Sequence, residues 1–209
     1  LVKGKQRYQA QDSKVEGDWS QAAFWTVGGS LGTSITCEGV NISSLQGDQA
    51  VVRIMERMGA AISQTANSVT VSGGATKATV IDAANCPDII PVLTVLAAVS
   101  EGTTKIINAG RLRIKECDRL AAMTSELNKM GASITEEPEG LTIVGKPEGL
   151  KGGVKVDAWN DHRVAMSLAI AVQKCAEPII LSGAESVAKS YPTFWEDYKS
   201  VGGLVEEEA

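Results

Sequence analysis

The sequence contains no long apolar run. No window of its 209 residues approaches 18 consecutive apolar positions, the length that favours a membrane-spanning helix. The first residues, LVKGKQRYQAQ, have neither the apolar core of a signal peptide nor an initiator methionine. We therefore expect a protein of the cytoplasm, without a membrane partner.

Metal-binding patterns are also missing. The chain has a single histidine, His162, and four scattered cysteines without a C-x-x-C pair: Cys37, Cys86, Cys117 and Cys175. These residues do not complete a zinc site in any familiar spacing. We expect no metal, no cofactor, and free thiols in a reducing compartment.

Positive charge is not in excess. The chain has 20 Lys and Arg against 25 Asp and Glu, a formal net charge of −5. Binding to a phosphate backbone normally shows as a basic excess, which argues against nucleic acid as the main partner. Any anion site must be local. The 44% hydrophobic and 22% charged residues suit a globular chain with a sizeable core.

What the sequence does contain is a repeat of about seventy residues. A helical pattern begins after Asp18, again at Asp88 and again at Asp161. A second mark has the same period, since an amphipathic helix ends each time at a glycine: Gly59, Gly131 and Gly202. Three units are implied. The alternative is that this spacing is a coincidence of element lengths.

Within each unit the expected elements follow one order. Each first helix is followed by a β-rich run, at residues 34–40, 103–110 and 177–185. A loop and a second helix come next, and then, in the first two units, a hairpin at residues 60–73 and 132–146. Such a unit cannot bury its apolar helix faces alone, so we expect one α/β domain with a shared core. Its units cover residues 14–79, 80–153 and 154–209.

The stretch RLRIKECDRLAAM, residues 111–123, concentrates charge at a helix start. Leu120, Met123, Leu127 and Met130 follow at helical spacing and predict a core-facing stripe. The charges alone would suit a solvated face of salt bridges. The other units, however, place charged residues at corresponding helix starts: Asp88, Asp161-His162-Arg163 and Lys189.

Five motifs in order give a family resemblance. RLRIKECDRL, WNDHRVAM, NCPDIIPVLTVLAA, VEGDWSQAAFW and KSYPTFWEDY together resemble the C-terminal domain of the 5-enolpyruvylshikimate-3-phosphate synthase family, from about Tyr8 to Gly203. The resemblance implies three βαβαββ-type repeats in an inside-out α/β barrel, with helices inward and sheets outward. Members are about twice this length, so residues 1–209 would be one domain and the N-terminal lobe would be absent.

The resemblance also implies an activity. The family transfers the enolpyruvyl group of phosphoenolpyruvate to the 5-hydroxyl of shikimate 3-phosphate and releases phosphate, a step in aromatic amino-acid biosynthesis. Both substrates and the missing lobe would be the partners, in a protein that is usually monomeric. The reaction needs groups that move protons at the hydroxyl and at the methylene carbon, and cations that hold a carboxylate and two phosphates.

Site residues follow from the motifs by resemblance. Asp88 and Glu116 resemble the acid-base carboxylates, and Lys115 resembles the lysine near the reacting hydroxyl. The substrate-binding candidates are Arg119 and Arg163 for the phosphoenolpyruvate carboxylate, Lys189 for its phosphate, His162 as a supporting group, and Arg111. As a residue pattern alone, Asp88 would also be suited to cap the helix that follows it.

Two departures and three rival readings remain. Cys117 replaces the serine common in the family motif, and Arg111 stands where some members have asparagine. The sister family that transfers enolpyruvate to a UDP-linked amino sugar shares the fold and the donor. A non-catalytic anion-binding module built of three repeats is a second alternative. A Cys117 nucleophile paired with His162 is a third, although nearby carboxylates would raise the pKa of that thiol.

Overall fold

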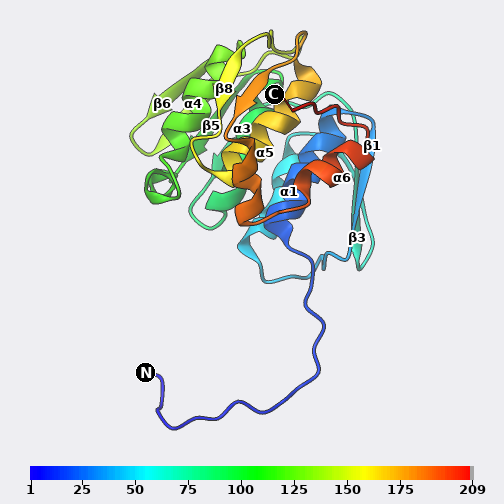
Figure 1. Cartoon of the computed structure of the whole chain (residues 1–209), viewed down its shortest axis with the longest axis vertical. Coiled ribbons are helices and arrows are strands. Elements are labelled where there is room, and N and C mark those ends of the chain that lie inside the picture. The colour runs from blue at the N-terminus through cyan, green and yellow to red at the C-terminus, as the bar shows by residue number, and fades with distance from the viewer. Residues whose placement is uncertain (208–209) are drawn as a thin grey trace.

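The computed structural model describes residues 1–207 and has mixed α/β architecture, as the sequence predicts (Figure 1). The first unit contains α1 (Trp19–Leu31), β1 (Ser34–Glu38), α2 (Ala50–Arg57), β2 (Ala61–Gln64) and β3 (Ser68–Ser72). The second contains β4 (Val80–Asp82), α3 (Ile90–Ala98), β5 (Thr103–Ile107), α4 (Arg119–Lys129), β6 (Ile134–Glu137) and β7 (Gly140–Val144). The third contains β8 (Lys155–Asp157), α5 (His162–Ala171), β9 (Ile180–Ser182) and α6 (Phe194–Ser200).

Five 3₁₀ helices join these elements. They are η1 (Gly47–Gln49), η2 (Pro87–Ile89), η3 (Gly110–Ile114), η4 (Val172–Lys174) and η5 (Ala184–Lys189). Three of them hold site candidates, because Asp88 lies within η2, Arg111 within η3, and Lys189 ends η5.

Each unit has its own sheet. In the second unit the strand order is β4-β5-β7-β6, with β4 parallel to β5 and the remaining pairs antiparallel, which is the full βαβαββ order. The first unit has β1-β3-β2, antiparallel throughout, and the third has the parallel pair β8-β9. Both hairpins expected from the sequence are present, as β2-β3 and β6-β7. The third unit lacks one within the described residues, also as expected.

Within the described residues, the first unit lacks the leading strand that the βαβαββ order of the family resemblance implies. In the other two units, the backbone N–H of the residue after the leading strand donates to the carbonyl of the last residue of the neighbouring strand. Ala83 donates to Ile107 and Ala158 donates to Ser182, both at 2.9 Å. Gly17 makes the corresponding bond to the Gly39 carbonyl, also at 2.9 Å. The chain before Gly17 then leaves β1 and runs outward as an extended, exposed segment (Figure 1).

The core consists of the three first helices. α1, α3 and α5 contact one another, and every residue of α3 is buried. A helix that is apolar all round must be covered on every side, and here the sheets lie outside the helices. Gly29 permits close packing of α1 on its sheet, because a Cβ there would lie 2.7 Å from the Val71 carbonyl oxygen. The inward helices and outward sheets predicted from the family resemblance are therefore observed.

The second helices are amphipathic, and their stripes face this core. Leu120, Met123, Leu127 and Met130 are all buried, as their spacing predicts. The glycines that mark the ends of these helices, Gly59, Gly131 and Gly202, all have positive φ, the conformation in which a helix commonly ends. Among residues 1–207, no helix has both the length and the apolar character to cross a bilayer.

Two of the three aspartates at the starts of the first helices cap those helices. Asp18 accepts a hydrogen bond from the backbone N–H of Ser20, and Asp161 accepts one from that of Arg163. Asp88 does not cap α3, contrary to the interpretation of the residue pattern. It lies inside η2, and its carboxylate is engaged by cations instead.

Candidate active site

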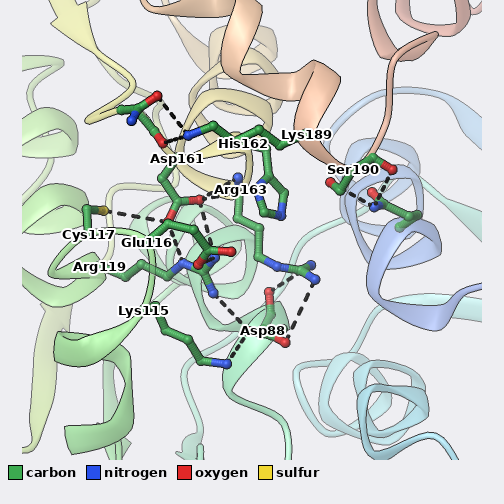
Figure 2. A network of polar contacts seen from close by, with 12 residues as sticks. Asp88, Lys115, Glu116, Cys117, Arg119, Asp161, His162, Arg163, Lys189 and Ser190 are labelled. Carbon is green, nitrogen blue, oxygen red and sulfur yellow. Dashed lines mark hydrogen bonds and ion pairs between the residues drawn. The ribbon is translucent and has the colours of Figure 1, made fainter.

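Six charged side chains from two units meet at the N-terminal ends of α4 and α5 (Figure 2). The second unit contributes η2, the segment after η3 and the start of α4, while the third contributes the start of α5. The six residues are Asp88, Lys115, Glu116, Arg119, Asp161 and Arg163. We call them the charged network. Its three cations and three carboxylates balance in formal charge.

Arg119 is the centre of the network. Its Nε lies 2.7 Å from Asp161 Oδ2, its Nη1 lies 2.8 Å from Asp88 Oδ1, and its Nη2 lies 2.6 Å from Glu116 Oε2. The side chain is only 1% exposed. Burial opposes the charge, but Asp161 and the two other carboxylates raise the pKa of the guanidinium. A planar fork of donors suits this role better than an ammonium does.

Asp88 is shared among three cations. Its Oδ1 lies 3.1 Å from Lys115 Nζ as well as next to Arg119, and its Oδ2 lies 3.8 Å from Arg163 Nη2. Burial disfavours the carboxylate, but Arg163, Lys115 and Arg119 lower its pKa below the usual value. Asp88 is therefore ionised at neutral pH and remains partly open to solvent.

Asp161 is a member of the network that the sequence did not assign to the site. It is fully buried and receives Nε and Nη2 of Arg119, at 2.7 and 3.3 Å, as well as the N–H of Arg163 at 2.8 Å. Burial opposes ionisation, but the Arg119 contacts and that backbone N–H lower the pKa of Asp161. The sequence marked it only as one of the charges at a helix start, before the His-Arg pair.

His162 lies beside the network without an ion pair of normal length. Its Nδ1 is 4.0 Å from Asp161 Oδ1 and has no hydrogen-bond partner among the described residues. Burial and the nearby Arg163 lower the pKa of the imidazole. The histidine is therefore neutral at pH 7, consistent with a supporting position.

Two other predicted residues stand at the margin of the network. Lys189 Nζ binds the carbonyl and side-chain oxygens of Asn160, at 2.5 and 2.7 Å, directly before Asp161 in the chain. Arg111 contacts no network residue in the described structure; its Nη1 donates to the Ala84 carbonyl at 3.4 Å. The structure thus brings Lys189 to the same end of the domain, whereas Arg111 lies apart.

The first unit adds an acidic group that the sequence did not single out. Asp48 lies within η1, directly before α2, and is buried. Ser20 Oγ donates a hydrogen bond to its Oδ2. Burial raises the pKa of Asp48, and the charge of Asp88 acts in the same direction while Arg163 opposes it. A glycine-aspartate pair at a turn gives no specific signal for such a position.

Cys117 is not an activated nucleophile. Its thiol donates to Asp161 Oδ2 at 3.6 Å, and burial together with that carboxylate raises the pKa of the thiol to about 12. A nucleophilic cysteine needs a lowered pKa, so the Cys117 reading is wrong. All four cysteines are free thiols.

The most exposed network groups are those that could meet a ligand. The Glu116 side chain is 40% exposed, and Asp88 and Lys115 are partly exposed, whereas Arg119 and Asp161 lie beneath them. The arrangement offers two carboxyl groups and a lysine at a surface backed by buried guanidinium and carboxylate groups. Such a surface can move protons and bind anions.

The sequence match extends over nearly the whole chain. A sequence model of the family described as EPSP synthase (3-phosphoshikimate 1-carboxyvinyltransferase) matches residues 1–198. The chain belongs to the EPSP synthase family. Relatives named 3-phosphoshikimate 1-carboxyvinyltransferase occur in Clostridium kluyveri, with 54% identity over 99% of this chain and 48% of that protein, and in Clostridioides difficile, with 50% identity over 99% and 47%. The chain spans about half the length of the curated relatives it matches.

Solved structures agree with the family and the fold. The EPSP synthase of Acinetobacter baumannii matches with a TM-score of 0.84 and 31% identity, over 92% of this chain and 47% of that one. The enolpyruvyl transferase NikO of Streptomyces tendae matches with a TM-score of 0.72 over 92% of this chain and 44% of that one. Its 20% identity supports the fold alone. The fold and family predicted from the five motifs are confirmed.

Proposed function

We propose that this EPSP synthase family chain is half of an enzyme that transfers the enolpyruvyl group of phosphoenolpyruvate to the 5-hydroxyl of shikimate 3-phosphate and releases phosphate. The observation that carries the proposal is the charged network. It places two partly exposed carboxylates, Asp88 and Glu116, within reach of Lys115 and above Arg119. An anion-binding module without catalysis would have no need of both carboxylates at the exposed surface.

The proposed chemistry divides among the exposed groups. The 5-hydroxyl oxygen bonds to C2 of phosphoenolpyruvate as its proton passes to one carboxylate, and C3 gains a proton from the other group, which acts in its carboxylic acid form. The tetrahedral intermediate then returns a C3 proton to the second group and loses phosphate from C2 with the proton held by the first, which restores the double bond and both groups. Asp88 and Glu116 serve as the two acid-base groups, and Lys115 stabilises charge at the oxygen atoms.

Substrate binding requires an exchange at Arg119. Each nitrogen of its guanidinium already has a carboxylate partner, and Glu116 is the most exposed of the three. A substrate carboxylate therefore replaces Glu116 at Nη2, and the released Glu116 becomes available for proton transfer. Arg163 supplies the second guanidinium, and Lys189, held by the two oxygens of Asn160, supplies the cation for the phosphate through its remaining N–H donor. His162 supports this surface, and Arg111 contacts the shikimate ring from the margin.

The remaining half of the site belongs to the rest of the protein. The chain matches about half the length of its relatives, and the proposal assigns the missing contacts to an N-terminal lobe. Residues 1–209 form one domain in this proposal, with units at 14–79, 80–153 and 154–209, in a monomeric cytoplasmic protein that needs no cofactor.

An activity assay tests the proposal. The whole protein, about twice this length, should release phosphate from phosphoenolpyruvate only when shikimate 3-phosphate is present. Turnover with a UDP-linked amino sugar in its place would select the sister activity, and binding of both anions without turnover would select the non-catalytic module. The 209-residue chain alone should fold and should not turn over, because misplaced substrates forfeit the effective molarity that catalysis needs.

A further inference from the structure

A strained turn joins β8 to α5. Trp159 and Asn160 both have φ of +53°, the left-handed conformation that residues with side chains seldom adopt. Asp157 Oδ1 accepts the backbone N–H of Trp159 at 2.6 Å, and the Ala158 carbonyl accepts that of Asp161 at 2.9 Å. Consecutive left-handed residues persist only where the surrounding structure holds them.

The turn positions two residues of the site, Asn160 and Asp161. Asn160 receives the ammonium of Lys189 through its carbonyl and side-chain oxygens. Asp161, the next residue, receives Arg119. Any rotation of the turn would therefore move both the Lys189 and the Arg119 contacts.

Glu126, on α4, forms hydrogen bonds with this turn. Its carboxylate is buried and accepts Trp159 Nε1–H at 3.0 Å and the backbone N–H of Asp157 at 3.0 Å. Lys129 Nζ lies 2.8 Å from both of its oxygens, and Ser125 Oγ lies 3.1 Å from one of them. Burial opposes ionisation, but the hydrogen bonds from Lys129, Trp159 and Asp157 lower the pKa of Glu126.

The first unit shows that packing alone does not require this carboxylate. Glu126 stands five residues before Gly131, and the residue five before Gly59 is Ile54. The backbone carbonyls of Ile54 and Glu126 each accept the N–H of the residue four positions later, and both side chains are buried. Ile54, however, is apolar. The turn between β4 and η2, which corresponds to the strained turn, has no residue with positive φ.

We propose that Glu126 is a positioning residue: through Trp159 and Asp157 it fixes the strained turn that aligns Asn160 with Lys189 and Asp161 with Arg119. No substrate contact is assigned to it. Its effect on phosphoenolpyruvate binding rests on the proposed function, whereas its effect on Arg119 does not.

The kinetic experiment uses the whole protein. Glu126→Ala should raise KM for phosphoenolpyruvate about tenfold, with a smaller change in kcat, because the Lys189 and Arg119 contacts are misplaced. On a Lys189→Ala background the same change should raise KM by clearly less than tenfold, because the Lys189 contact is already lost and only the Arg119 contact can still be displaced. Trp159→Phe removes the indole N–H together with one ring and should act in the same direction, so it provides a second test if Glu126→Ala fails to fold. Ile54→Ala is the matched control: it removes a buried side chain at the corresponding place and should leave KM unchanged.

A second readout does not depend on activity. In the ¹⁵N-labelled 209-residue chain, the Arg119 Nε–H resonance should shift in Glu126→Ala and in Trp159→Phe, and should stay in place in Ile54→Ala. An unchanged Arg119 resonance in both turn variants would overturn the proposal, as would equal KM changes in Ile54→Ala and Glu126→Ala. If the unaltered whole protein does not use phosphoenolpyruvate, the proposed function fails and the resonance alone decides the role of Glu126.

Discussion

Arg119 and Asp161 form an ion pair that is closed to solvent. Nε and Oδ2 are 2.7 Å apart, and the side chains are 1% and 0% exposed. The pair joins the second helix of one unit to the first helix of the next, so the site and the packing of the units share the same contact. Removing Asp161 would leave the buried Nε of Arg119 without its partner, while Asp88 and Glu116 still hold the two Nη atoms.

Asp161→Ala should therefore destabilise the 209-residue chain by roughly 1.5–3 kcal/mol, the usual scale for losing a buried hydrogen bond to a charged group. Urea unfolding at pH 7 measures this change. Asp18→Ala is the control, because Asp18 also caps a first helix but forms no ion pair in the described residues. Loss of a cap alone costs about 1 kcal/mol. Equal losses in the two variants would mean that Arg119 finds another partner.

The two exposed carboxylates should control turnover in the whole protein. Asp88→Ala or Glu116→Ala is expected to lower kcat by roughly a hundredfold or more, the scale of general acid-base groups. Cys117→Ser should be nearly silent, because the thiol is held protonated beside Asp161. Phosphate release at saturating substrates measures both. A Cys117→Ser variant without activity would contradict these assignments.

His162 should titrate below pH 6.5. Burial and the adjacent Arg163 lower the pKa of the imidazole from 6.5. Because the unfolded chain then binds the proton more tightly, the contribution of His162 to stability is complete above about pH 6.5 and falls as the pH drops below that value. It is the only histidine in the chain, so its ring protons are assigned directly in a ¹H NMR titration. A midpoint above 6.5 would show a stronger interaction with Asp161 than the geometry gives.

Removing residues 1–13 should leave the stability of this chain unchanged. All thirteen are exposed, and the first contacts with the domain involve Glu16 and Gly17. Thermal unfolding of the shortened chain measures the effect. Removal of residues 1–18 is the contrasting variant, because it also deletes the cap of α1 and the Gly17–Gly39 bond, and it should lower the melting temperature.

The sequence predicted what depends on local spacing. The stripe from Leu120 to Met130, the closing glycines and both hairpins follow from periodicity and turn residues, and they occur where expected. The family motifs predicted five of the six network residues: Asp88, Lys115, Glu116, Arg119 and Arg163. The sequence did not assign Asp161 to the site because its partner Arg119 is 42 residues away. The packing of α4 against α5 creates this pair.

Two predictions were wrong because each depended on contacts between residues that are far apart in the sequence. Asp88 was suited to a helix cap by its residue type, but three cations from later in the chain compete for its carboxylate. The family resemblance implied a leading strand in the first unit, yet a strand forms only where its neighbour provides a series of hydrogen bonds. Within the described residues only Gly17 makes such a bond, to the carbonyl of Gly39 just after β1.

The mutual burial of α1, α3 and α5 sets the order in which this chain can fold during synthesis. Helices separated by some seventy residues each bury their apolar surfaces against the other two, so the first two units leave the ribosome with those surfaces still open. Pairing over such separations is slow, and incomplete chains with exposed apolar helices are prone to aggregate. Completion of the core must wait for α5, which makes the last third of the chain the step that commits the whole domain to its native state.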